Sequence, residues 1–219
     1  MSLMRTPDER FANLPGWLFT PQYVDINGAR VHYVDEGQGD VILCLHGEPS
    51  WSYLYRNMIP LIAAKNRVIA FDWIGFGRSD KYSELGDYSF AMHHDTLVAF
   101  IEQLDLRGIT LVCQDWGGII GLAVATELAE RFARLVIMNT GLPTGDRPMG
   151  QGFMQWREFA ERTGRDLEPG RLLAISSVNA PADEILAAYD APFPDASYRA
   201  GVAAFPLLIP LNLDDPGAA

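Results

Sequence analysis

The sequence has few of the features that mark secreted, membrane-spanning or disulfide-rich proteins. Its 219 residues include only two cysteines, Cys44 and Cys113, and both stand in apolar runs, so they indicate small buried side chains and no disulfide framework. No apolar run approaches the ~18 residues of a membrane span. The first residues, MSLMRTPDER, lack the apolar stretch of a signal peptide. We therefore expect a cytoplasmic protein with no membrane partner.

Basic residues are also scarce. The 17 Lys and Arg residues stand against 28 Asp and Glu, which gives a formal net charge of -11, and no run of basic residues occurs. A nucleic-acid-binding surface needs clustered Lys and Arg, so nucleic acid is not expected as a partner. The apolar fraction of 48% is ordinary for a globular chain that is long enough to bury a large core.

The first 141 residues alternate between strand and helix patterns. The segments 23–26 and 29–36 flank Asn27-Gly28, the preferred pair of a type I′ turn, and this predicts a hairpin. Four continuous apolar runs, typical of parallel strands covered on both faces, follow at 41–45, 67–71, 109–113 and 135–139. Helical spacing at 89–104 and 117–132 separates them. The alternation predicts an α/β fold with a mostly parallel sheet and an N-terminal hairpin.

From residue 142 the pattern changes to amphipathic helices at 152–164, 169–178 and 182–190, separated by proline clusters. No convincing parallel strand follows. We therefore expect residues 1–141 to form the sheet-containing core and residues 142–219 to form a helical cap that is inserted into this fold.

The strongest chemical signal is Cys113-Gln114-Asp115-Trp116-Gly117-Gly118, which follows one predicted strand and opens a helix. This is the context of a nucleophile elbow, with Asp in place of the usual Ser. A helix cap would also explain Asp115, but capping does not call for the Trp-Gly-Gly that follows. A carboxylate at this place can displace a leaving group from an sp3 carbon and form an ester.

Two companion motifs follow other strands. His46-Gly47-Glu48-Pro49 stands after the strand at 41–45, where an α/β hydrolase takes its second oxyanion N–H donor, and we interpret His46 as structural. The stretch 72–79, DWIGFGRS, follows the strand at 67–71 and is interpreted as a turn at the rim of the site, with Arg78 also structural.

Together these motifs resemble the haloalkane dehalogenases of the α/β-hydrolase superfamily, in the subgroup with an HGEP loop and a QDWGG elbow. The resemblance extends to GFMQW (152–156) and to the segment 191–206. It implies that Asp115 is the nucleophile and that the indole N–H groups of Trp116 and Trp156 bind the leaving halide. Backbone N–H groups of Glu48 and Trp116 would stabilise the oxyanion when water attacks the ester, and the Glu48 side chain would orient that water.

The resemblance also implies an apolar substrate pocket and a set of ligands. Phe153, Phe205 and Pro206 are expected to line the pocket. The expected ligands are a small apolar halogenated substrate, water and a halide ion. No cofactor and no metal are expected, and the protein is expected to be a monomer.

The family mechanism also needs a histidine base and an acid that orients it, both after the nucleophile. No histidine follows Asp115: the four present are His32, His46, His93 and His94. The acid position after the strand at 135–139 reads Asn139-Thr140. We therefore expect the remaining core strands, the acid and the histidine to lie beyond the 219 residues.

Two alternatives stay open. An epoxide hydrolase also uses an elbow aspartate, but it needs acidic O–H donors, for which Tyr189 and Tyr198 are the candidates. The other alternative is an incomplete fragment that binds ligand or becomes alkylated at Asp115 without turning over.

Overall fold

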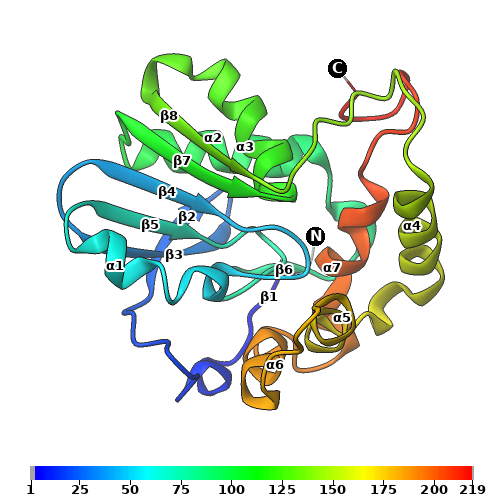
Figure 1. The fold of residues 1–219 in the computed structure, drawn as a ribbon, viewed down its shortest axis with the longest axis horizontal. Coiled ribbons are helices and arrows are strands. Elements are labelled where there is room, and N and C mark those ends of the chain that lie inside the picture. The colour runs from blue at the N-terminus through cyan, green and yellow to red at the C-terminus, as the bar shows by residue number, and fades with distance from the viewer. Residues whose placement is uncertain (1–2, 219) are drawn as a thin grey trace.

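A six-stranded sheet forms the centre of the computed structural model, which describes residues 3–218 (Figure 1). Three residues lie outside the described range: Met1 and Ser2 of the predicted core (1–141) and Ala219 of the predicted cap (142–219). The strands are ordered β2-β3-β5-β4-β7-β8, with bounds Gln22–Ile26 (β2), Ala29–Gly37 (β3), Val41–Leu45 (β4), Arg67–Phe71 (β5), Ile109–Gln114 (β7) and Phe132–Met138 (β8). Strands β5, β4, β7 and β8 run parallel to one another, and β3 pairs antiparallel with both of its neighbours, β2 and β5. The predicted α/β class and mostly parallel sheet are confirmed.

The N-terminal hairpin has the predicted turn. Ile26 pairs with Ala29, which leaves Asn27 and Gly28 as the two turn residues. Both have positive φ angles, 54° and 82°, as a type I′ turn requires. A separate two-stranded sheet joins β1 (Leu3–Met4) to β6 (Lys81–Tyr82).

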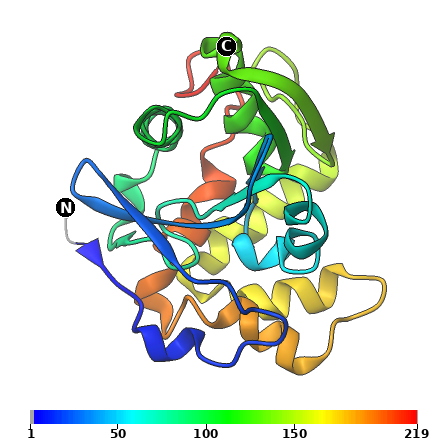
Figure 2. The ribbon, with the colours of Figure 1, turned by 90° about the vertical axis from the view of Figure 1, so that its left-hand side faces the viewer.

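The two faces of the sheet carry separate apolar cores because strand side chains alternate between faces. Helices α2 (Phe90–Gln103) and α3 (Trp116–Glu127) cover one face, and α1 (Ile59–Ala63) covers the other; Figure 2 shows α1 and α2 on opposite sides. Leu43 and Leu111 belong to the first core, whereas their neighbours Cys44 and Val112 belong to the second. Both cysteines are free and buried, as predicted.

The predicted helix over 117–132 is wrong at its C-terminal end. Helix α3 ends at Glu127, a 3-10 turn follows over Ala129–Arg131, and β8 already begins at Phe132. Phe132 pairs with Ile109 of β7, and its partly buried side chain packs against the first core. Tertiary pairing therefore outweighs the local preference of these residues for a helix.

The cap consists of helices at the end of the sheet where the parallel strands finish (Figure 1). Its helices are α4 (Gln151–Thr163), α5 (Pro169–Ser176), α6 (Asp183–Asp190) and α7 (Ala200–Ala204). The first three match the predicted amphipathic stretches, while α7 is too short for periodicity to reveal. The division of the chain at residue 141 stays a prediction.

Short 3-10 turns complete the structure. Besides the turn before β8, they lie at Asp8–Phe11, Ser52–Tyr55, Leu85–Asp87, Gly164–Asp166, Ala196–Arg199 and Phe205–Leu207. Among residues 3–218, none of the helices combines the length and the apolar character needed to cross a membrane.

Strand β8 forms one edge of the sheet. Its residues Leu135, Val136 and Ile137 are 48%, 44% and 53% exposed, although their apolar character suits a strand covered on both faces. Within the part of the chain that the structure describes, β8 thus has an unpaired edge and apolar surface in contact with solvent. Such an edge favours association with other chains.

Candidate active site

Asp115 stands in the sharp turn between β7 and α3. Its φ and ψ angles are 51° and -129°, a conformation that residues other than glycine rarely adopt, and it occupies the N-cap position of α3 without a side-chain capping bond. The simple helix-cap interpretation of Asp115 therefore does not hold. The main chain is fixed instead: Asp115 N donates to Asn139 O at 3.1 Å, and Thr140 Oγ1 donates to Asp115 O at 2.7 Å.

The glycines around Asp115 are required by close packing. A Cβ atom on Gly117 would lie 2.2 Å from Leu45 O, and one on Gly118 would lie 2.4 Å from Thr140 Oγ1. A Cβ atom on Gly47 would lie 2.3 Å from the Cβ and Oδ1 atoms of Asp115. The HGEP loop and the elbow therefore fit against each other only because these positions have no side chain.

This packing gives the Asp115 carboxylate a fixed hydrogen-bond donor. Glu48 N donates to Asp115 Oδ1 at 2.8 Å. Burial raises the pKa of Asp115, and the backbone N–H groups of Trp116 and Glu48 act in the opposite direction by stabilising the carboxylate. The same two N–H groups are the donors expected to form an oxyanion hole.

The side chain of Glu48 lies in the same site. Burial, and after it the charge of Asp115, raises the pKa of Glu48 well above its usual value. Its Oε1 atom is buried and has no hydrogen-bond partner among residues 3–218. Since buried polar atoms are normally paired, this oxygen is available to a water or a ligand.

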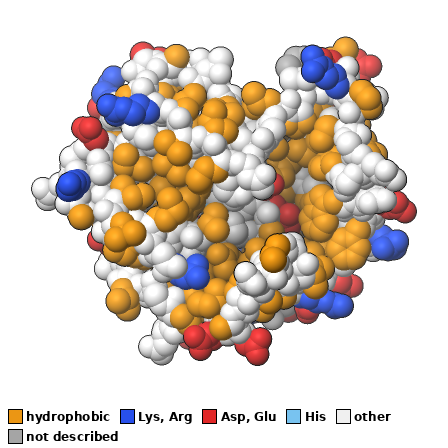
Figure 3. Space-filling model, viewed as in Figure 1, with side chains coloured by type: hydrophobic (Ala, Val, Ile, Leu, Met, Phe, Trp, Pro, Cys, Tyr) orange, Lys and Arg blue, Asp and Glu red, His pale blue; other side chains and the backbone are white. Residues whose placement is uncertain are grey.

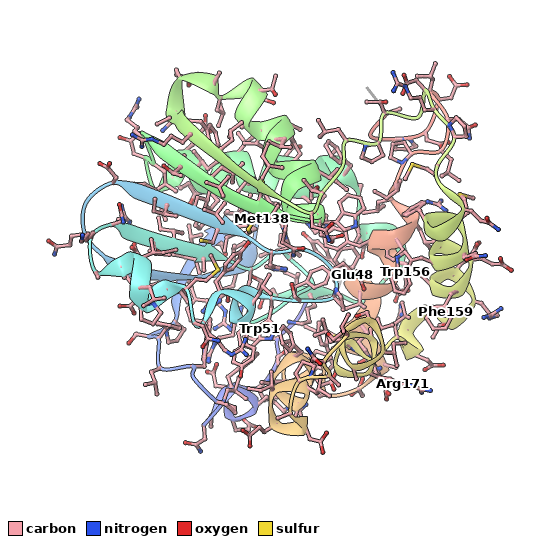
Figure 4. The ribbon with its side chains drawn as sticks, in the orientation of Figure 1. Glu48, Trp51, Met138, Trp156, Phe159 and Arg171 are labelled. Atoms are coloured by element: carbon pink, nitrogen blue, oxygen red, sulfur yellow. The ribbon has the colours of Figure 1, made fainter. Side chains whose placement is uncertain are left out.

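Asp115 and Glu48 lie in a cavity of about 540 Å³ between the core and the cap. Figure 3 shows this hollow with mainly hydrophobic walls, and Figure 4 shows Glu48 and Trp156 close together across it. Apolar side chains from α4 and α5 form its cap side: Trp156, Phe159, Leu172 and Ile175. Of these four, only Trp156 was predicted from the sequence. The available signal was spacing, since Phe159 follows Trp156 by three residues and Ile175 follows Leu172 by three, which places each pair on one helix face.

The tryptophans fall into two groups. The indole N–H groups of Trp51 and Trp73 donate to Ala188 O at 3.1 Å and to His46 O at 2.8 Å, so these side chains are structural. The indole N–H groups of Trp116 and Trp156 make no hydrogen bond to any residue in the described range 3–218. The indole N–H group of Trp17 has no such bond either, but its ring packs against Phe19 and Trp51 in the second core. The two tryptophans assigned to the halide are therefore among the three whose indole N–H groups have no protein partner in this range.

Among residues 3–218, neither Trp116 nor any of the three expected pocket residues is one of those that line the cavity. Phe205 is fully buried and stacks on the Trp116 ring, with centroids 4.7 Å apart and planes 11° apart. Pro206 is buried next to it, and its carbonyl oxygen accepts from Arg157 Nη1 at 3.1 Å. Phe153 of α4 is partly buried against the first core. Their role as pocket residues stays a prediction, and Phe205 contacts the halide candidate Trp116 directly.

None of the four histidines is among the described residues that line the cavity. His46 is fully buried, with Nδ1 2.9 Å from Gly47 O and with Nε2 accepting from Trp73 N at 3.3 Å. His32 pairs with Asp72 at 2.6 Å. His93 is buried against Phe205, and His94 contacts Asp95 and Glu127 near the surface. The structural interpretation of His46 agrees with these contacts.

The two tyrosine candidates, and Asp215, the last acidic residue of the sequence, make their contacts elsewhere in the structure. Asp215 accepts from Leu211 N at 2.7 Å and Asn212 N at 3.0 Å in an exposed turn. Tyr189 packs against Tyr53 in the second core, and Tyr198 packs against the first core. Within residues 3–218 no group of His, Cys, Asp and Glu has the arrangement of a metal site.

Comparisons with known proteins agree with this geometry. The family model for the alpha/beta hydrolase fold matches residues 40–180. Haloalkane dehalogenases of Psychrobacter cryohalolentis and Mycolicibacterium paratuberculosis are 47% and 48% identical, over 100% and 99% of this chain and 74% of each relative. The solved haloalkane dehalogenase DpaA of Paraglaciecola agarilytica, described as tetrameric, superposes with a TM-score of 0.93 at 45% identity, over 98% of this chain and 74% of that one. The expectation of a monomer for this chain stays a prediction. The chain belongs to the haloalkane dehalogenase family of α/β hydrolases.

Proposed function

We propose that this site cleaves carbon–halogen bonds of small haloalkanes through an ester on Asp115. The observation that carries the proposal is the Asp115 carboxylate, held by Glu48 N–H at 2.8 Å in a cavity that it shares with Trp156. A free carboxylate oxygen attacks the sp3 carbon from the side opposite the halogen. The bond from oxygen to carbon forms as the carbon–halogen bond breaks, and the halide leaves with the bonding electron pair.

The halide needs donors but no proton. Indole N–H groups are donors only, and they carry no charge that would have to be desolvated. The N–H groups of Trp116 and Trp156 have no protein partner within residues 3–218, so they can turn to the developing anion. Phe205 supports this arrangement because its ring stacks on Trp116.

Hydrolysis of the ester releases the alcohol. Water adds to the carboxyl carbon of Asp115, and the negative charge that forms on the carbonyl oxygen is stabilised by the N–H groups of Glu48 and Trp116. The unpaired Oε1 of Glu48 can hold this water. The water must also lose a proton, and no histidine of the described chain lines the cavity to accept it.

The two steps should therefore have different rates in the 219-residue chain. Ester formation needs only Asp115 and the halide donors, whereas hydrolysis lacks a general base worth ~10²–10⁴-fold in rate. Bromide release from bromobutane, measured over time, should therefore show a burst of about one equivalent and then slow turnover. Continued rapid release would mean that a base is already present within the 219 residues.

A further inference from the structure

A second cavity of about 270 Å³ adjoins the one that contains Asp115. The two cavities share three lining residues: Phe159, Leu172 and Ile175. The far side of the second cavity is formed by Leu167 and by polar residues that include Glu168 and Arg171. The three shared side chains therefore stand as a partition between a reactive compartment and a distal compartment.

The partition is made from two helices that face each other. Phe159 lies one helical turn after Trp156 on α4, and their rings are 5.9 Å apart. Leu172 and Ile175 are spaced by three residues on α5, so they lie on one face of that helix. In Figure 4, Trp156 and Phe159 are labelled on α4 and Arg171 on the neighbouring α5.

The members of the partition differ in how firmly they are held. Leu172 is 8% exposed, whereas Ile175 is 71% exposed and has few neighbours to fix it. Phe159 is partly buried, and the Arg162 guanidinium lies 6.0 Å from the centre of its ring. Phe159 is the largest of the three shared side chains, and only packing contacts hold its ring in place.

We propose that Phe159, with Ile175 opposite it, determines how long an alkyl chain the site accepts. This inference rests on the proposed function, because the reacting carbon must lie at Asp115 while the rest of the chain extends toward the partition. An alkyl group that reaches Phe159 gains no further buried contact unless the ring moves. Removing the ring joins the two compartments into one apolar channel, in which Leu167 and Leu172 contact the extra methylenes.

Unreactive alcohols from butanol to decanol test the partition without chemistry. In equilibrium dialysis, the affinity of the 219-residue chain for the alcohol should rise about fourfold with each added methylene. It should level off once the alkyl chain is long enough to reach Phe159. In Phe159→Ala the rise should continue by at least one more methylene, and Ile175→Ala should do the same to a smaller extent. Met154→Ala, on α4 but outside both cavities, and Val178→Ala, beyond the end of α5, are the matched controls and should keep the wild-type profile.

Alkylation of Asp115 by bromobutane through bromodecane separates failure of this inference from failure of the proposed function. If no bromoalkane forms an adduct, the proposed function fails, and the alcohol profiles still decide the partition. If adducts form but Phe159→Ala and Ile175→Ala leave the dependence on chain length unchanged, the partition is refuted. A steady rise through decanol in the wild-type chain would also overturn it. Because Ile175 is largely exposed, its variant tests the inference even if Phe159→Ala does not fold.

Discussion

Replacing Gly47 by alanine should slow alkylation of Asp115 strongly. The added Cβ atom would lie 2.3 Å from both Cβ and Oδ1 of Asp115, and 2.7 Å from its carboxyl carbon. Gly47 has no left-handed φ angle, so the effect comes from this contact and not from backbone strain. The main chain of Asp115 is fixed by Asn139 and Thr140, so the carboxylate has to rotate away.

The size of the effect follows from the displacement of the attacking oxygen. Rotation breaks the 2.8 Å hydrogen bond from Glu48 N to Asp115 Oδ1, which fixes the orientation of the carboxylate. A displacement of about 1 Å from the reactive geometry lowers a rate by about 100-fold. The crowding should also cost roughly 1–3 kcal/mol of stability, which lowers the melting temperature by roughly 2–12 °C in a chain of this size.

The assay is the single-turnover rate of ester formation with bromobutane, followed by intact-protein mass. Gly141→Ala is the matched control, since a Cβ atom at Gly141 would have nothing within 4 Å. This control should react at the wild-type rate. A Gly47→Ala chain that is folded and alkylated as fast as wild type would refute the claim that the HGEP loop positions the nucleophile.

Three further predictions concern the halide site, a buried lysine and the sheet edge. Trp116→Phe and Trp156→Phe keep the aromatic ring but remove the donor, so bromide binding measured by fluorescence quenching should weaken about 10- to 150-fold, while Trp17→Phe should leave it unchanged. Burial lowers the pKa of Lys81 to about 7 from 10.5, so the folded chain binds fewer protons than the unfolded chain between these values, and stability should rise with pH over this interval. Urea unfolding at several pH values should show that rise in wild type and lose it in Lys81→Met; an unchanged slope would contradict the assignment. Ile137→Lys should reduce aggregation of the 219-residue chain in light scattering, because it places a charge on the exposed edge strand, and equal aggregation would show that another surface is responsible.

The four parallel strands could be predicted because each contains a continuous apolar run, and the hairpin could be predicted from its Asn27-Gly28 turn. The exception is β8, which begins three residues before its apolar run, at Phe132. The segment 128–134 has no strand pattern of its own, and its conformation depends on pairing with Ile109 in β7. Sequence periodicity carries no information on such a pairing.

The core side of the site could be predicted because its residues directly follow predicted strands. Asp115 and Glu48 each follow a parallel strand, and the ends of such strands meet at one edge of the sheet. The cap side could be predicted only in part. Whether Phe159 or Phe205 faces the cavity depends on how α4 and the turn at Phe205–Leu207 pack. The stacking of Phe205 on Trp116 has no counterpart in the sequence pattern.

Whether Asp115 is the nucleophile can be decided by locating the ester on the chain. The 219-residue chain is incubated with bromobutane, digested with protease and analysed by peptide mass spectrometry. We expect one butyl group, on Asp115, in the wild-type chain and none in Asp115→Asn, since a neutral amide is a poor nucleophile. A butyl group on Glu48 or on any other residue, or the same adduct in Asp115→Asn, would contradict this assignment.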